Sequence, residues 1–248
     1  YRVLAVAGDA TPVVVTTHGR IVLLEAGGPR HLALAVQRSA KPAAIPGSKD
    51  VALGSENGSV RRLVRDGGEP RLEYVVARGD APVGALAAAA DRVVYARLDG
   101  VVLEAPFAGG APRELARPRR AVRDLRVAGP TAYLLEGGTL VTVGEAAPWA
   151  ARTSDVPARA AASTGGCAAR EARALAVSKD GVFAALLVGD AIEVRRLADG
   201  ARVATSALAR RSPTALAFDG DGRTLFVATA SDARPWRVPL ATRPVSAR

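Results

Sequence analysis

Hydrophobic and polar residues follow one another in short runs along most of the chain. Between residues 81 and 120, apolar or β-branched runs cover 82–90, 93–97 and 101–106, and a weaker run covers 113–118. Glycine, proline and aspartate separate these runs, as in "LDG" and "AGGAP". Runs of about four to eight such residues between turn-forming residues predict β-strands joined by tight turns. The segment therefore predicts four antiparallel strands in about 40 residues.

The same order of strands and turns is expected in six units. The second strands are predicted at 13–17, 51–55, 93–97, 132–136, 183–188 and 225–230. The third strands are predicted at 21–26, 59–64, 101–106, 140–144, 192–197 and 235–240. Residues 171–177 favour a helix by composition, but their place in the repeat predicts a first strand. No helix of ordinary length is expected.

Two residue types return along the chain with a nearly constant period. Arginine follows a glycine-rich turn at Arg30, Arg71 and Arg113, and the same spacing separates Arg202 from Arg243. Aspartate returns at this spacing in two series, Asp9, Asp50 and Asp91 and then Asp180 and Asp221. The period of about 41 residues falls in the range, about 20–50 residues, that indicates a repeat architecture.

The fold class that these patterns predict is all-β, a six-bladed β-propeller of four-stranded antiparallel blades in one domain of residues 1–248. The expected blades are approximately 1–38, 39–80, 81–120, 121–154, 172–210 and 211–248, with residues 155–171 as a loop insertion between two blades. The last unit ends in "RPVSAR", which is a poor fourth strand. Seven blades, one of them outside this sequence, are the alternative.

The repeated glycine-arginine phrase has a structural interpretation. It is expected to be the turn between the third and the fourth strand of a blade, where glycine supplies a positive φ. The arginine then begins the outermost strand, and a charge there discourages pairing with the edge of another sheet.

Composition adds a strongly basic charge. The formal net charge is +10 and the isoelectric point is about 10.8, almost entirely from arginine, because Lys41, Lys49 and Lys179 are the only lysines. A basic balance raises the possibility of a nucleic-acid or acidic partner. The arginines are scattered, however, and the densest group is "RPRRAVR" at 117–123. Nucleic-acid binding is therefore kept as an alternative.

Cysteine content and hydropathy bear on the compartment. Cys167 is the only cysteine, so no disulfide framework is possible. No apolar run is long enough to span a membrane as a helix, and no signal peptide is evident. We expect a cytoplasmic location, with the periplasm as the alternative. Because the chain begins at Tyr1 in an expected strand and contains no methionine, we also expect a domain of a longer protein or a processed product.

Residues 175–208 and 216–240 share the order strand, Asp-Gly turn, apolar strand, short turn, strand. In this they resemble the WD40-like repeats of bacterial β-propellers, although the Gly-His and Trp-Asp pairs of the eukaryotic pattern are absent. The resemblance implies a scaffold or sensor module. Such propellers are often attached to, or act beside, ATPase, kinase, protease or von Willebrand-type domains.

Catalytic motifs are missing from the sequence. It contains no G-x-S-x-G elbow, no Walker loop and no H-E-x-x-H. The only histidines, His18 and His31, are expected on opposite faces of a blade, so they do not suggest a metal site. We therefore expect no enzyme and no cofactor. A lactonase-like, metal-dependent hydrolase with carboxylates around a central channel is kept as a second alternative.

A binding site is expected where two sets of loops meet on one face of a propeller, the turns between second and third strands and the loops between blades. The residues predicted to contact a partner are Arg38, Arg78, Arg117, Arg119, Arg120, Arg123, Arg152, Arg210, Arg211, Asp99, Glu136, Asp190 and Asp232. Arginine is enriched at protein interfaces, and insertions in repeat proteins commonly lie on a binding face. We expect a non-catalytic protein-interaction or sensing module of a larger bacterial protein or complex.

Overall fold

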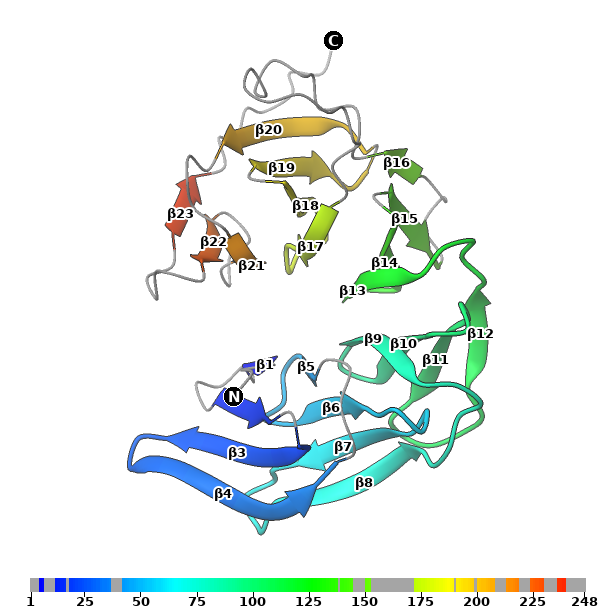
Figure 1. Cartoon of the computed structure of the whole chain (residues 1–248), viewed down its shortest axis with the longest axis vertical. Helices are drawn as coiled ribbons and strands as arrows, with labels where there is room; N and C mark the ends of the chain where they lie inside the picture. Colours follow the sequence, from blue (N-terminus) through cyan, green and yellow to red (C-terminus); the bar gives the residue numbers. More distant parts are fainter. Residues whose placement is uncertain are drawn as a thin grey trace. The chain divides into compact units, whose positions relative to one another are not determined.

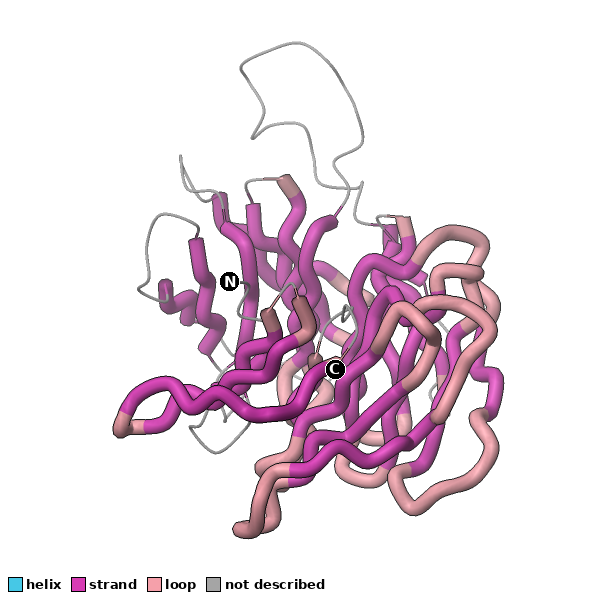
Figure 2. Tube along the Cα trace, turned by 60° about the horizontal axis from the view of Figure 1, so that its bottom comes forward, coloured by secondary structure: helices cyan, strands magenta, loops and turns pink. Residues whose placement is uncertain are grey.

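The structure is a computed structural model, and its chain is built from β-strands. It describes residues 5–6, 12–16, 18–36, 42–137, 139–144, 150–152, 172–189, 191–198, 200–207, 213–218, 224–229 and 236–239. These residues form five four-stranded sheets and one three-stranded sheet, and no helix occurs among them (Figure 2). No part of the described chain forms a helix long and apolar enough to cross a membrane.

The strands follow one another along the sequence. The first three sheets contain β1 (Ala5–Val6), β2 (Pro12–Val15), β3 (Arg20–Glu25), β4 (Gly28–Ala35), β5 (Ala43–Ala44), β6 (Val51–Gly54), β7 (Val60–Val64), β8 (Arg71–Val76), β9 (Val83–Ala88), β10 (Arg92–Arg97), β11 (Val102–Pro106) and β12 (Arg113–Ala116). The other three contain β13 (Val122–Ala128), β14 (Thr131–Glu136), β15 (Thr139–Val143), β16 (Ala150–Arg152), β17 (Ala172–Val177), β18 (Phe183–Val188), β19 (Ala191–Arg196), β20 (Arg202–Ala207), β21 (Pro213–Phe218), β22 (Thr224–Thr229) and β23 (Trp236–Pro239).

Each sheet is a meander in which every strand pairs with its neighbour in the sequence. In the third sheet the order from one edge to the other is β9, β10, β11 and β12, and all three pairings are antiparallel (Figure 1). Only short turns join such strands, so the chain reverses at alternate ends of the sheet. The turn between β10 and β11 consequently lies at the same end as the loop that leads from β12 to the next sheet.

The chain divides into two compact units, and the division passes through the fourth sheet. One unit contains Tyr1–Gly137 and Thr142–Pro148, and the other contains Gly138–Val141 and Trp149–Arg248. In the first unit the opening strands of successive sheets contact one another, β1 with β5, β5 with β9 and β9 with β13. In the second unit β17 contacts β21 in the same way. Contact between successive first strands is the arrangement of neighbouring propeller blades.

Hydrophobic clusters fill the space between successive sheets. One cluster joins Ala52 and Val60 of the second sheet to Leu86, Val93 and Tyr95 of the third, all of them buried. Another joins the first sheet to the second, and a third joins the fifth sheet to the sixth. Second strands such as β6 and β14 are buried along nearly their whole length because they are covered on both faces. Valine and leucine suit such positions.

The strand predictions are confirmed where the structure describes the chain. Residues 171–177 contain strand β17, not a helix, so the repeat overrides local helix propensity. The glycine-arginine phrase does form the turn between third and fourth strands, and Gly28, Gly67, Gly109 and Gly200 have the positive φ expected there. The insertion at 155–171 and the C-terminal residues 243–248 lie outside the described residues.

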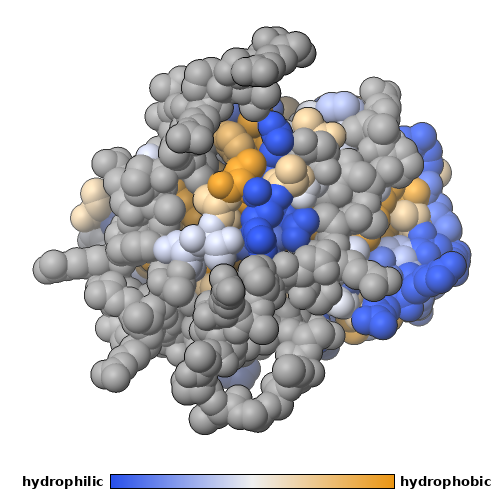
Figure 3. Space-filling view, turned by 90° about the horizontal axis from the view of Figure 1, so that it is seen from above, coloured by the Kyte–Doolittle hydropathy of each residue, from blue (hydrophilic) through white to orange (hydrophobic). Residues whose placement is uncertain are grey.

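Exposed hydrophobic residues are few on the described surface. In the view of Figure 3, small hydrophobic areas adjoin hydrophilic ones, with no single extended apolar region among the described residues. The large hydrophobic side chains with substantial exposure are Leu24, Tyr74, Leu98, Val182 and Val203. Leu98 and Tyr74 are the most exposed of these, at 65% and 60%.

Candidate functional site

The turn between β10 and β11 is the centre of the predicted site. Arg97 accepts a backbone hydrogen bond from Gly100 at 3.1 Å and donates one to Val101 at 2.8 Å. Gly100 has a φ of 87°, and the Asp99 side chain accepts a hydrogen bond from the Val101 amide at 3.3 Å. Aspartate and glycine are the residues that such a turn favours, because one closes it by hydrogen bonding and the other tolerates positive φ.

Arg97 connects this turn to the loop between the second and third sheets. The pairing of β9 with β10 shifts register at Arg97, and irregularities of this kind redirect a side chain at the end of a strand. The guanidinium forms ion pairs with Asp80 at 2.8 Å and with Asp99. Hydrogen bonding from Arg97 lowers the pKa of Asp99, and the same pairing raises the pKa of Arg97.

The turn between β6 and β7 contacts the same inter-sheet loop. The amide of Gly79 donates to the carbonyl of Asn57 at 3.4 Å, and the amide of Val83 donates to the carbonyl of Ser55 at 3.1 Å. Gly58 packs directly on Gly79, where a Cβ atom at Gly58 would approach the Gly79 Cα atom to 2.7 Å. The two backbones come this close only because neither residue has a side chain.

The next inter-sheet loop, residues 117–121, continues the same surface. The Arg120 amide donates to a carboxylate oxygen of Glu136 at 2.7 Å, which ties this loop to the end of β14. The two predicted sets of loops therefore do alternate and touch in the first unit. We call this surface, made of residues 55–59, 77–82, 97–101 and 117–121 together with Glu136, the loop face.

The acidic residues of the loop face are engaged within the protein. Asp80 and Asp99 pair with Arg97, and Glu136 accepts the Arg120 amide. By contrast, Arg78 and Arg119 are exposed and have no ion-pair partner among the described residues. The exposed Arg120 side chain likewise has none in the described part of the chain. The accessible charge of the loop face is therefore positive.

Leu98 supplies an apolar side chain amid these arginines. It is 65% exposed although it lies in the centre of a hydrogen-bonded turn. Its amide donates to the Pro82 carbonyl at 2.8 Å, and its side chain lies over Gly84, where a Cβ atom would approach Leu98 to 2.6 Å. The absence of a side chain at Gly84 thus provides the space into which Leu98 settles.

The other predicted contact residues are placed less fully. Arg117 pairs with Glu114 at 3.0 Å and Arg123 is exposed. Arg152 belongs to β16, but its side chain is not described. Outside the described residues lie Arg38, Asp190, Arg210, Arg211 and Asp232. A role in partner binding stays a prediction for the whole set.

Possible metal ligands do not gather in the described part of the chain. No group of three or more His, Cys, Asp or Glu side chains is arranged there to hold a metal ion. His18 and His31 are both exposed. Cys167 lies outside the described residues.

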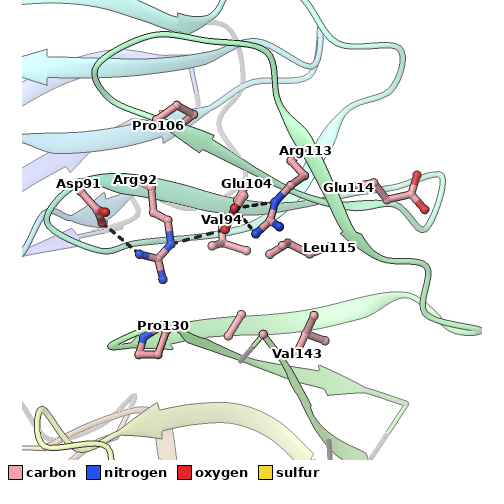
Figure 4. A pocket seen from close by; sticks show the side chains of 12 residues that line it. Asp91, Arg92, Val94, Glu104, Pro106, Arg113, Glu114, Leu115, Pro130 and Val143 are labelled. Carbon is pink, nitrogen blue, oxygen red and sulfur yellow. Dashed lines mark hydrogen bonds and ion pairs between the residues drawn. The ribbon is translucent and has the colours of Figure 1, made fainter. Parts of the chain in front are cut away.

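A second feature was not predicted from the sequence. A cleft of about 650 Å³ lies within the first unit, between the third sheet and residues 130–132 and 143–144 (Figure 4). Arg92, Glu104 and Arg113 line it from three adjacent strands, and Figure 4 shows Glu104 between the two arginines. Arg113 belongs to the repeated phrase, but the regular spacing of that phrase indicated only a turn and an outer strand.

Comparison with known proteins rests on structure. No family profile matches the sequence, and no curated protein matches it. Among solved structures, the chain is similar to Kluyvelomyces marxianus Hsv2, with a TM-score of 0.63 and 12% identity over 97% of this chain and 72% of that one. It is also similar to a chain of the mitotic checkpoint complex, with a TM-score of 0.68 and 13% identity over 95% and 80% of the two chains.

The chain has a WD40-like β-propeller fold. The four-stranded meanders and the contacts between successive first strands agree with these likenesses. The number of blades in the propeller stays a prediction. At 12% and 13% identity the likeness concerns the fold alone, so the function of the propeller has to be argued from its own surface.

Proposed function

We propose that this propeller is a non-catalytic protein-interaction module of a larger bacterial protein or complex, and that it binds its partner through the loop face. One observation carries the proposal. Leu98 is exposed among arginines without ion-pair partners in the described chain, while the carboxylates of the same loops are used within the protein. The proposed partner presents an acidic surface with an apolar recess for Leu98.

Interface energetics support this assignment. A small number of buried apolar and arginine side chains carry most of the binding free energy in protein interfaces. Leu98 is held by its amide hydrogen bond and by contact with Gly84, so little conformational entropy is lost when a partner covers it. The surrounding positive charges would steer an acidic partner and raise the association rate.

One of the similar structures is itself a chain of a multiprotein assembly, the mitotic checkpoint complex. This supports protein partners as the first class to test. The division of residues 1–248 into six blades of a single domain, with residues 155–171 as an insertion between blades, is part of the proposal. So is the cytoplasmic location, for which the single cysteine is the support.

Nucleic-acid binding is the second candidate, because the net charge is +10 and Arg78, Arg119 and Arg120 present open guanidinium groups. Its signature is a steep loss of affinity with rising salt, since each phosphate contact releases counterions. The metal-dependent hydrolase has no supporting observation among the described residues.

The test is a quantitative pull-down from native lysate with and without nuclease. The baits are the wild-type chain, a Leu98→Ser variant and an Arg78→Ser/Arg119→Ser/Arg120→Ser variant. The control is Arg71→Ser, because Arg71 pairs with Asp66 and Glu73 on β8, away from the loop face. We expect one defined protein whose recovery falls about tenfold with each loop-face variant and is unaffected by nuclease or by the control.

Recovery that disappears with nuclease would instead establish the nucleic-acid candidate. Equal recovery by all baits would reject the loop face as the binding surface.

A further inference from the structure

The two faces of the third sheet have opposite character. Val93, Tyr95 and Ala105 lie on one face and pack into the apolar cluster shared with the second sheet. Side chains alternate along a strand, so their neighbours Arg92 and Glu104 lie on the other face, which borders the cleft. A charged ladder thus crosses β10, β11 and β12 where the fold elsewhere places apolar contacts between sheets.

Arg92 forms the fixed part of this ladder. Its Nη1 donates to Asp91 at 3.1 Å, its Nη2 donates to the Gly129 carbonyl at 2.8 Å, and its Nε lies 3.5 Å from Glu104. The Arg92 side chain is only 20% exposed. All three guanidinium nitrogens are engaged, so Arg92 holds the turn before β14 against the third sheet and defines the width of the cleft.

Glu104 and Arg113 retain hydrogen-bonding capacity toward the cleft. Both Nε and Nη2 of Arg113 donate to the same oxygen of Glu104, Oε1, at 2.9 and 2.6 Å. Among the described residues, Nη1 of Arg113 has no acceptor, and Oε2 of Glu104 has only the 3.5 Å ion pair with Arg92. An open donor and an open acceptor side by side match the C=O and N–H of a peptide bond.

The remaining lining is apolar and the charges nearly cancel. Pro106, Leu115, Pro130 and Val143 line the cleft together with the ladder (Figure 4). Three carboxylates, those of Asp91, Glu104 and Glu114, accompany two guanidinium groups. An acidic ligand would meet an excess of negative charge, and a basic one would compete with arginines already in place. A volume of about 650 Å³ is within the usual range for ligand sites.

We propose that this cleft is a second binding site, separate from the loop face, for an extended uncharged peptide segment of a partner protein. A main-chain amide of the segment pairs with Arg113 Nη1 and Glu104 Oε2, and its apolar side chains contact Leu115, Pro130 and Val143. Binding at this site depends little on salt, because the ligand carries no net charge.

The experiment is a selection of phage-displayed random heptapeptides on the whole chain, followed by synthesis of the enriched sequence. Its dissociation constant is measured by fluorescence anisotropy for the wild type, Arg113→Met and Leu115→Ser. The matched control is Arg71→Met, because Arg71 begins β8 as Arg113 begins β12. Circular dichroism checks that each variant is folded, and Arg113 is 73% exposed, so its replacement leaves the core intact.

We expect an enriched peptide that is apolar and uncharged, with affinity reduced about tenfold by Arg113→Met and by Leu115→Ser. Arg71→Met and the triple loop-face variant should leave the affinity unchanged, which separates this site from the proposed function. The proposal is overturned if no enriched peptide depends on Arg113 and Leu115. It is equally overturned if the dependent peptides are acidic and lose affinity steeply with salt.

Discussion

Replacing Gly58 by alanine tests whether the two sets of loops meet as the structure shows. Gly58 has a φ of 75°, where an alanine costs about 1–2 kcal/mol. Its Cβ atom would also lie 2.7 Å from the Ala81 carbonyl oxygen and 2.7 Å from the Gly79 Cα atom, both backbone atoms. The inter-sheet loop would have to move, and overpacking of this kind costs about 1–3 kcal/mol more.

The control is Gly47→Ala, because Gly47 has the same φ of 75° and a Cβ atom added there would have no neighbour within 4 Å. We expect Gly58→Ala to lower the free energy of unfolding by about 1–3 kcal/mol more than Gly47→Ala. In a thermal scan this is a further drop of about 2–12 °C. Urea unfolding followed by circular dichroism measures the difference. Equal losses for the two variants would refute the contact between the Ser55–Ser59 turn and the loop at 77–82.

Two further predictions concern stability and pH. Asp50 is buried and bonded to Arg62 and to the Arg65 amide, so Asp50→Asn should lower the unfolding free energy in urea by about 2–3 kcal/mol. Asp91→Asn, one period later and 75% exposed, should change it by less than about 0.5 kcal/mol, and similar losses would contradict this assignment. Burial raises the pKa of Tyr95, so the stabilisation from its neutral phenol is present below the ordinary tyrosine pKa and is lost as pH rises through the raised value. Alkaline urea titrations should show this loss in the wild type and a weaker one in Tyr95→Phe, with exposed Tyr74→Phe as the control; identical curves for Tyr95→Phe and wild type would disprove it.

The strands were predictable because their signals are local and repeated. Residues 183–188 and 171–177 show why the period mattered, since one is a strand by its composition and the other only by its place in the repeat. The period did not predict side-chain roles. Asp50 and Asp91 occupy equivalent positions, yet one is buried in an ion pair and the other is exposed, because Arg62 has no counterpart near Asp91 on the third strand of its sheet.

The candidate site was predictable as a location and not as a set of contacts. Loop order along the sequence implied that Asp80 and Asp99 lie on one face, but their shared pairing with Arg97 depends on the register shift at the end of β10. The exposure of Leu98 depends on Gly84, which is distant in sequence. The cleft requires residues from two sheets, so no single segment of the sequence could indicate it.

The arginines of the repeated phrase are explained by their contacts. Arg30 pairs with Glu25 and Glu69, Arg71 with Asp66 and Glu73, and Arg113 with Glu104. Each ties an outer strand to neighbouring residues, which agrees with a structural role at the sheet edge. Of these three, Arg113 alone also lines the cleft.

The most direct test of the central claim is site-specific photo-crosslinking from the loop face. A photoreactive residue replaces Leu98 in one version of the chain and Ala108 in another, since Ala108 lies in the turn after β11, at the opposite end of the same sheet. Both are irradiated in native lysate treated with nuclease. We predict a covalent adduct with one protein from position 98 and none from position 108. An absence of protein adducts at position 98, or the same adducts from both positions, would contradict binding through the loop face.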